Sequence, residues 1–393
     1  MAELYFFTIF GCFVAAMCLK YKTTNYKIMK RLFLPLLCLL LLACSDKNTP
    51  SGPNWGDIPP YEDEKPEQPE KPEDPKDENK PDEGGNNNGG SGDQFTERYI
   101  VPTTEVAPSG ENSLGLRYEP GISINIATKN FATRLSDIAA AGFKYIEITI
   151  KHEFGLMNKS DDEVREIFAE RQAAVDNAGL KLWSIHLPYE DATWTNIGGS
   201  ESIRKQSVEN IMRVLRLCTE KFPECKNFVL HASKGTLSPR SKSVEQARKS
   251  LQEMIPVATS LGVRLCVENL VGSLCPTPSE LTATINGIDN AWVTYDIGHA
   301  NCVGEDIINF LEKIGPRLGT VHIHDTIFGS RKDDHRMIGE GNVDRWDEVY
   351  NAMLNTNGYR GVFLFELSGA NTTQLMNKYK EIVESYKKRY ETK

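Results

Sequence analysis

The sequence lacks the excess of positive charge that nucleic-acid-binding domains carry. Its 393 residues include 45 Lys and Arg against 54 Asp and Glu, a formal net charge of −9. Residues 61–83 account for −7 of this charge, and residues 115–393 are close to neutral, with 34 basic and 36 acidic side chains. Because DNA and RNA binding depends largely on neutralising phosphates, we expect no nucleic-acid partner.

The region from Ser45 to about Gly92 has almost no apolar side chains. It runs through "YEDEKPEQPEKPEDPKDENKPDE" and then "GGNNNGGSG". A segment of this composition cannot bury enough apolar surface to offset the entropy of its chain. We therefore predict a disordered linker over residues 44–114, which tethers a folded domain over residues 115–393.

The cysteines lack any zinc-ribbon spacing. Five of the nine lie beyond residue 115, and this number is odd. We assign no disulfide and expect several of the five to be small buried apolar residues. They are Cys218, Cys225, Cys266, Cys275 and Cys302.

A short apolar run marks the N-terminal region. Met29 begins "MKRLFLPLLCLLLLACSDKNTP", in which residues 32–42 are apolar but too few for a typical spanning helix. The pattern resembles a bacterial lipoprotein signal peptide over residues 29–43, which implies lipidation of Cys44 and a lipid-anchored protein of the cell envelope, periplasmic or outer-membrane. The alternative is a membrane anchor with an incidental cysteine. If Met29 is the true start of the protein, residues 1–28 are an extension assigned to it in error. The alternative is that they form an upstream transmembrane segment.

From residue 115 onward, short apolar runs alternate with amphipathic helical patterns. About eight such units in some 275 residues predict a (β/α)8 TIM barrel. No glycine-rich dinucleotide fingerprint follows the first run, which disfavours a doubly wound open sheet. Helices are predicted over 161–179, from an acidic turn to a glycine, and over 202–222. The predicted strands are 121–126, 145–150, 181–186, 227–232, 263–268, 292–297, 319–324 and 362–367.

Nearly every predicted strand carries a titratable side chain at its carboxyl end, where TIM barrels place their chemistry. Six of the seven histidines lie there or in the following loops, and only His152 is peripheral. The strand-end residues in chain order are Glu147, His186, His231, Glu268, Asp296 with His299, His322 with His324, and Glu366.

Simpler interpretations exist for single members of this set. A buried carboxylate such as Glu268 or Glu366 is costly unless paired, so each could belong to a salt bridge or to a metal site. Asp333 and His335 follow the seventh strand and could be solvated residues of a surface turn. The glycines of "IGEGNVD" allow a tight chain crossing near the barrel mouth.

Seven motifs together resemble the xylose-isomerase-like barrel superfamily, which includes sugar isomerases, 3-epimerases and endonuclease IV. The motifs are "SIHLPYE", "FVLHAS", "CVENLVG", "YDIGHAN", "VHIHDT", "DDHRMIGEGNVD" and "FELS". In the epimerases one divalent ion, Mn²⁺, Mg²⁺, Co²⁺ or Zn²⁺, is held by four side chains. The resemblance implies that these are Glu268, Asp296, His322 and Glu366 here. It also implies that the two glutamates act as catalytic acid and base, and that the substrate meets Glu147, His186, His231, His299 and His324.

The resemblance to endonuclease IV implies a different metal count. That family binds three zinc ions, and all nine ligand positions are occupied here. The additional candidates are His186, His231, His299, Asp333 and His335. His324, however, stands where endonuclease IV has Asn, and it matches no metal ligand in either group.

Three functions follow from these observations. The first is an exported metal-dependent sugar isomerase or epimerase of carbohydrate metabolism, or a related lyase on an oxidised glycoside. Its substrate is expected to be a free or glycosidic sugar, because phosphorylated sugars are scarce outside the inner membrane. The second is a zinc phosphodiesterase, and the third is a non-catalytic carbohydrate-binding lipoprotein. The complete carboxylate set favours the first function over the third.

Overall fold

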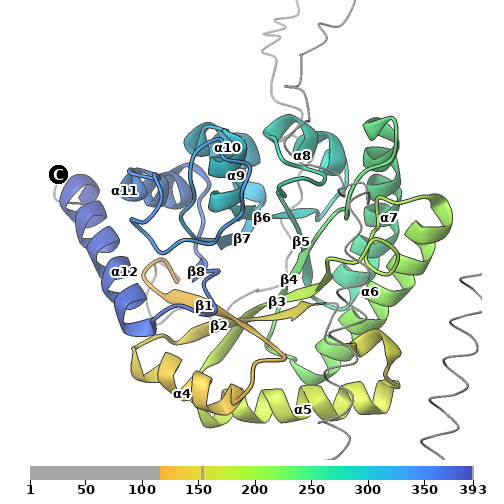
Figure 1. Cartoon of the computed structure of the whole chain (residues 1–393), viewed down its shortest axis with the longest axis horizontal. Helices are drawn as coiled ribbons and strands as arrows, with labels where there is room; N and C mark the ends of the chain where they lie inside the picture. The colour runs from red at the N-terminus through yellow and green to blue at the C-terminus, as the bar shows by residue number, and fades with distance from the viewer. Residues whose placement is uncertain (1–115, 152–154, 392–393) are drawn as a thin grey trace, which may run out of the picture. The chain divides into compact units, whose positions relative to one another are not determined.

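The structure, a computed structural model, describes residues 116–151 and 155–391. Within them, eight parallel strands form one sheet in the order β7-β6-β5-β4-β3-β2-β1-β8 (Figure 1). The strands are β1 Pro120–Asn125, β2 Tyr145–Lys151, β3 Lys181–Tyr189, β4 Asn227–Leu230, β5 Arg264–Glu268, β6 Trp292–Asp296, β7 Leu318–His322 and β8 Phe363–Phe365.

The two ends of the sheet meet just beyond β7. Ile323 forms a parallel bridge with Phe365 of β8, in which the Ile323 N–H donates to the carbonyl of Leu364 at 2.8 Å. The Glu366 N–H in turn donates to the carbonyl of Ile323 at 3.1 Å. These bonds close the sheet into a (β/α)8 TIM barrel, which confirms the predicted fold.

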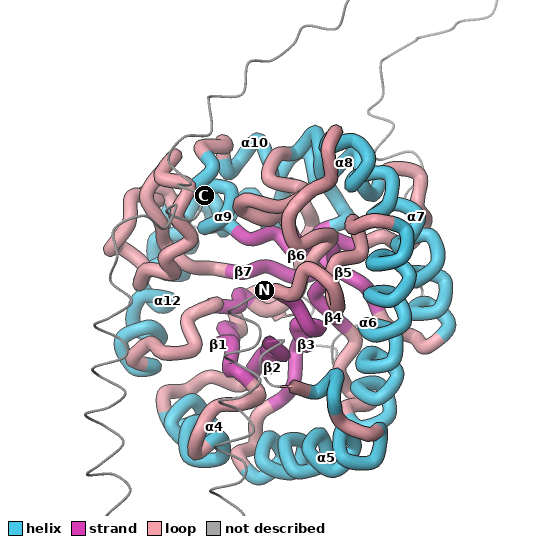
Figure 2. The backbone as a smooth tube through the Cα atoms, turned by 45° about the vertical axis from the view of Figure 1, so that its right-hand side comes forward, coloured by secondary structure: helices cyan, strands magenta, loops and turns pink. Residues whose placement is uncertain are grey.

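Helices surround the strands, as the tube in Figure 2 shows most clearly. Helices α4 to α11 lie in the connections between successive parallel strands, and α12 follows β8. They are α4 Phe131–Ala140, α5 Asp161–Asn177, α6 Glu201–Lys221, α7 Arg240–Ser260, α8 Pro278–Ile285, α9 Ile297–Val303, α10 Ile307–Ile314, α11 Trp346–Asn351 and α12 Thr372–Tyr386. Short helical turns lie at Leu156–Asn158, Gly315–Arg317, Ala352–Thr356 and Lys387–Glu391. None of the helices in the described part of the chain has the length and apolarity that crossing a membrane requires.

Helix α5 shows how local sequence sets the ends of an element. The Glu163 N–H donates to Ser160 Oγ at 3.3 Å, and the Ser160 N–H donates to Glu163 Oε2 at 2.8 Å, which forms a capping box. Gly179, with a φ of +66°, follows the helix as its αL terminator. One face buries Phe168, whose ring centroid lies 5.3 Å from that of Phe222. The predicted helix is confirmed to within two residues.

Two predicted strand ends differ from the structure in a way that matters for the site. β7 ends at His322, so His324 lies two residues beyond it rather than at its last position. Glu147 is the third of seven residues in β2, not a strand-end residue. It pairs in register with Ser123 and Ser184, in a buried polar layer inside the barrel. The apolar pattern of a strand does not show which of its residues lies level with the barrel mouth. For this reason the prediction that both residues end their strands was wrong.

All five cysteines of the barrel are buried free thiols, and the prediction that several of them are small buried residues is confirmed. The predicted extension 1–28, signal peptide 29–43, lipidated Cys44 and linker 44–114 lie outside the described residues, as does His152.

Loss of the α5 capping box tests this account of the local structure. Ser160→Ala removes a hydroxyl that accepts an otherwise unpaired N–H, and we expect a loss of about 1 kcal/mol in the free energy of unfolding. The matched control is Ser136→Ala, whose hydroxyl donates to the Ala132 carbonyl inside α4. Urea unfolding should show a change of no more than about 0.5 kcal/mol for the control. Equal effects of the two substitutions would contradict the assignment.

Candidate metal centre

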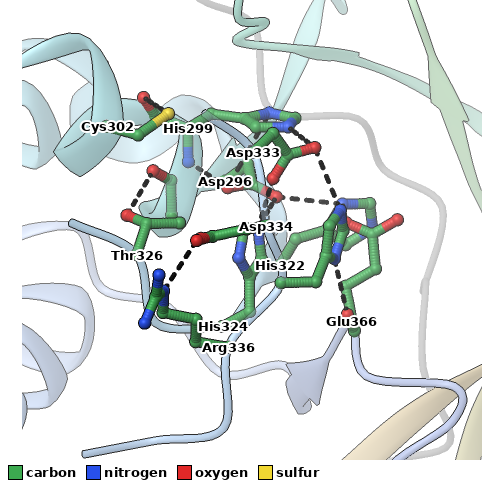
Figure 3. A network of polar contacts seen from close by, with 12 residues as sticks. Asp296, His299, Cys302, His322, His324, Thr326, Asp333, Asp334, Arg336 and Glu366 are labelled. Carbon is green, nitrogen blue, oxygen red and sulfur yellow. Dashed lines mark hydrogen bonds and ion pairs between the residues drawn. The ribbon is translucent and has the colours of Figure 1, made fainter. Parts of the chain in front are cut away.

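Four side chains from the ends of β5, β6, β7 and β8 meet at one point, and we call them the central group. They are Glu268, Asp296, His322 and Glu366, and one potential ligand atom from each lies within 4.8 Å of all the others. His322 Nδ1 lies 3.0 Å from Glu268 Oε1, 3.2 Å from Glu366 Oε2 and 3.7 Å from Asp296 Oδ2. Figure 3 shows three of the four side chains. The structure thus brings together the four residues that the sequence singled out.

The central group has the composition of a divalent-cation site. A single ring nitrogen carries at most one proton, and here it faces three carboxylates in a buried space. Burial by itself lowers the pKa of His322, but the charges of Glu147, Glu366 and Glu268 raise it well above its usual value. Buried carboxylates of this density are stable only when they are paired or bound to a metal. Three carboxylates and one imidazole suit Mn²⁺, Mg²⁺, Co²⁺ or Zn²⁺.

Glu147 holds the other side of the His322 ring. His322 Nε2 lies 3.1 Å from Glu147 Oε1, and Ser184 Oγ donates to Glu147 Oε2 at 2.6 Å. A carboxylate on the second nitrogen of a metal-binding imidazole fixes its tautomer and orientation. Glu147 is fully buried and does not line the cavity, so its assignment as a substrate-binding residue stays a prediction.

A second convergence joins His186 on β3 and His231 after β4 to Glu268, and we call it the inner group. The two Nε2 atoms lie 3.1 Å apart, and they lie 3.2 and 3.0 Å from Glu268 Oε2. His186 Nδ1 donates to the Leu187 carbonyl at 2.9 Å, which turns Nε2 toward Glu268. Burial raises the pKa of Glu268, but the charge of His322 and hydrogen bonds from both histidines outweigh it and hold the pKa well below its usual value.

A third convergence, the outer group, consists of His299 in α9 with Asp333 and His335 in the loop after β7. Figure 3 labels His299 and Asp333. Asp333 Oδ2 lies 3.1 Å from His299 Nε2 and 3.0 Å from His335 Nε2. Burial lowers the pKa of His335, but the hydrogen bond to Asp333 and nearby carboxylates raise it to about 10. Asp333 and His335 thus line the cavity at its solvent edge, where their side chains remain 30% and 35% exposed, so this turn is at the surface but its charges face the barrel mouth.

Asp325 and two glycines hold that loop in place. Asp325 accepts hydrogen bonds from the backbone N–H groups of Gly339 and Val343, at 2.9 and 3.1 Å. Gly339 has a φ of +88°, and a Cβ on Gly341 would lie 2.1 Å from Asp325 Oδ1. The tight crossing predicted for "IGEGNVD" is confirmed at both glycines. The role of Asp325 carried no separate signal in the sequence.

Asn269, which follows Glu268, was also missed by the sequence analysis. Its side chain accepts from the Asp296 N–H at 2.7 Å and donates to the Asp296 carbonyl at 2.9 Å. Its own carbonyl accepts from His299 Nδ1 at 2.7 Å. Asn269 thereby fixes a ligand of the central group and an imidazole of the outer group, and only its position in "ENL" hinted at this.

A cavity of about 770 Å³ opens at the carboxyl ends of the strands. Glu268, Glu366 and four of the histidines line it, which are His186, His231, His299 and His335. Tyr189, which the sequence analysis missed, also lines it, with its ring centroid 4.2 Å from that of His186. Burial raises the pKa of Tyr189, with Glu366 the next contributor, so its hydroxyl keeps its proton at neutral pH. The cavity therefore offers carboxylates, imidazoles and a phenol to a polar ligand of the size that enzyme pockets bind.

His324 is fully buried and does not line the cavity. Its Nε2 lies 3.1 Å from Asp296 Oδ2, and its ring stacks on His335 with centroids 4.1 Å apart. Its predicted contact with substrate stays a prediction.

Residues 135–389 match the family described as xylose isomerase-like TIM barrel, and the chain belongs to this family. An uncharacterized protein of Methanocaldococcus jannaschii is 29% identical over 215 residues, which cover 51% of this chain and 70% of that protein. A probable endonuclease 4 of Persephonella marina is 24% identical over 201 residues, 46% of this chain and 67% of that protein.

Among solved structures, the fold is similar to those of sugar epimerases. L-Ribulose 3-epimerase superposes with a TM-score of 0.56 at 19% identity, covering 70% of this chain and 97% of that chain. A D-tagatose 3-epimerase-like protein gives a TM-score of 0.55 at 24% identity, covering 69% and 98%. At these identities the likeness shows the shared barrel.

The central group predicts a measurable gain in stability when metal binds. Free Mn²⁺ at about 100 times its Kd should raise the free energy of unfolding of the metal-stripped protein by about 2.7 kcal/mol. His322→Gln removes the one imidazole of the group and should abolish most of this gain. Thermal unfolding with Mn²⁺ and with a chelator measures it.

Glu312→Gln, at an exposed position of α10, is the control and should keep the full gain. A gain that is as large in His322→Gln as in the wild type would contradict the assignment.

Proposed function

We propose that this protein is a metal-dependent sugar isomerase or epimerase. The observation that carries the proposal is the position of Glu268 and Glu366. Both line the cavity, and both contact the same nitrogen of His322, at 3.0 and 3.2 Å. Moving a proton next to a carbonyl needs one group to take the proton and another to return it, and two carboxylates at one site meet that need.

The protonation states of the two glutamates support this chemistry. Burial raises the pKa of Glu366, but the charge of His322 and its hydrogen bond outweigh it and lower the pKa, as for Glu268. An ionised carboxylate can remove the proton from the carbon beside the sugar carbonyl. The enediolate that results is then protonated at another carbon by the carboxylic acid that has just formed, or on its other face by the second glutamate, which must first take a proton from solvent because it too starts ionised. A divalent ion held by the central group would supply a Lewis acid for the sugar's oxygens.

The remaining cavity side chains suit a hydroxylated ligand. His186, His231 and His299 present nitrogens to the cavity, and Tyr189 presents a protonated hydroxyl. These groups can orient a sugar by hydrogen bonds to its hydroxyls, and the sugar itself need not carry a charge. The same proton abstraction would serve elimination on an oxidised glycoside, so a lyase is a close variant of the proposal.

A zinc phosphodiesterase is the second candidate. It is favoured by the inner and outer groups, which surround the central group with further imidazoles, and by the relatives named probable endonuclease 4. The near-neutral charge of residues 115–393 argues against DNA as the substrate.

Solvent exchange distinguishes the two candidates. We expect the metal-loaded protein in D₂O to incorporate deuterium beside the carbonyl of a ketohexose or 3-keto-glucoside, as seen by NMR. Glu366→Gln and Glu268→Gln should each slow this exchange by at least about 100-fold, because each removes an acid–base group.

Glu312→Gln should exchange at the wild-type rate. The isomerase would be rejected in favour of the phosphodiesterase by two results together. Neither the ketohexose nor the 3-keto-glucoside would exchange, and the protein would cleave bis(p-nitrophenyl) phosphate in the presence of zinc. Tight sugar binding without exchange or cleavage would instead support the carbohydrate-binding lipoprotein.

We also propose that the enzyme is exported and anchored to a membrane of the cell envelope through a lipid on Cys44. The support is the apolar run that ends in "LLAC" and the charged, proline-rich segment that follows it. This placement favours free or glycosidic sugars as substrates.

Cells grown with an alkyne-labelled fatty acid should yield labelled protein in the membrane fraction. Cys44→Ser should abolish the label, whereas Cys38→Ser, inside the apolar run, should retain it. Labelled Cys44→Ser protein would contradict the lipid assignment.

A further inference from the structure

Two cationic side chains line the cavity without an ion-pair partner, and we call them the rim pair. They are Lys234, which follows β4, and Arg331, in the loop after β7. Within residues 116–151 and 155–391, neither side chain forms an ion pair or a hydrogen bond. The third cation of the cavity, Lys151, differs from them, because its Nζ lies 3.9 Å from Glu190 Oε2.

The carboxylates of the cavity do not neutralise the rim pair. Four of the five that line it have a cationic or imidazole nitrogen within 4 Å, and these are Glu190, Glu268, Asp333 and Glu366. In the described residues Glu340 is the one lining carboxylate without such a neighbour. Two uncompensated cations against one uncompensated carboxylate leave the rim with an affinity for an anion.

The backbone of Arg331 is held in a conformation that arginine rarely adopts. Its φ is +56°, in the left-handed region that favours glycine and asparagine. Its N–H donates to the Cys302 carbonyl at 2.7 Å, which fixes the residue against α9. Of the six non-glycine residues with positive φ in the described part of the chain, three line the cavity, which are Glu190, Arg331 and His335. Strained residues of this kind concentrate at ligand sites.

The backbone of Lys234 is fixed by a buried side chain. Asn196 Nδ2 donates to the Lys234 carbonyl at 3.1 Å, and Asn196 Oδ1 accepts from the Lys234 N–H at 3.3 Å. The same Oδ1 accepts from Ser233 Oγ at 2.9 Å. The point from which the ammonium group extends is therefore set, while the side chain itself is exposed to the cavity.

We propose that Arg331 binds a carboxylate of the substrate and that Lys234 adds positive potential at the rim, so that the enzyme acts on acidic sugars such as uronates. A guanidinium presents a planar fork that matches the two oxygens of a carboxylate, whereas an ammonium acts as a point charge. The imidazoles and the Tyr189 phenol of the cavity hydrogen-bond to the hydroxyls of any sugar. The rim pair adds what they lack, a means of distinguishing an acidic sugar from a neutral one.

This inference rests on the proposed sugar isomerase or epimerase and names its substrate class. A guanidinium also binds phosphate, so the substituent needs a separate test. The proposed location outside the cytoplasm favours the carboxylate, because phosphorylated sugars are scarce there.

Three ketoses that differ only at C6 test the inference. D-Fructose has a hydroxyl group on this carbon, D-fructuronate a carboxylate and D-fructose 6-phosphate a phosphate. Calorimetry measures the Kd of each for the metal-loaded protein, and NMR in D₂O measures exchange of the proton beside the carbonyl. We expect the wild type to bind D-fructuronate about 10- to 100-fold more tightly than D-fructose, as hydrogen bonds between charged groups provide.

Variants of the rim pair connect this preference to its residues. Arg331→Gln should lower the preference for D-fructuronate over D-fructose by at least about 10-fold, because it removes the charged fork. Arg331→Lys keeps the charge without the fork and should give an intermediate preference. Lys332→Gln is the matched control, since it removes the same charge at the next position, outside the cavity lining, and should keep the wild-type preference.

Three results would overturn the inference. They are D-fructuronate binding no more tightly than D-fructose, a preference that is unchanged in Arg331→Gln, and a preference for D-fructose 6-phosphate without one for D-fructuronate. Exchange of D-fructose without any preference would reject the carboxylate site and leave the isomerase standing. Tight binding of D-fructuronate that depends on Arg331, without exchange of any ketose, would support the carboxylate site and count against the isomerase.

Discussion

The structure depends on neutralising a set of buried carboxylates around a single imidazole. Glu147 faces one nitrogen of His322, and Glu268, Asp296 and Glu366 face the other. One proton on each nitrogen cannot compensate four negative charges in a buried space, and leaving a charge unpaired there is costly. A divalent cation among the three carboxylates on one side would reduce the imbalance, and the Ser184 hydroxyl donates a hydrogen bond to the carboxylate on the other side.

The barrel is what brings these charges together and keeps them rigid. The four residues of the central group are the last residue of β5, β6 and β7 and the first residue after β8, so their spacing is set by the sheet. Loop residues also contribute to the site. The Asp325 carboxylate accepts two backbone hydrogen bonds that hold the loop carrying Asp333 and His335 in place. Strands thus define the central group, and anchored loops add the outer imidazoles.

Much of this could be predicted from the sequence, because strand order and strand-end residues are local patterns. The apolar runs predicted the barrel and a set of titratable strand-end residues, and the resemblance to the xylose-isomerase-like superfamily selected the central group from that set. The depth of Glu147 could not be predicted, since a period of two gives the face of a strand but not its layer in a barrel. Asn269 and Tyr189 were missed because their roles arise from contacts across neighbouring strands. The space that the buried ring of His324 fills depends on Gly298, which lies 26 positions away in the sequence.

We propose that the first divalent ion binds among three carboxylates and a single imidazole, His322. Electron spin-echo spectroscopy of the protein carrying one equivalent of Mn²⁺ tests this claim directly. We expect modulation from one coordinated imidazole nitrogen, present in the wild type and in His324→Gln and lost in His322→Gln. Nitrogen modulation that persists in His322→Gln, or its absence from the wild type, would contradict the account.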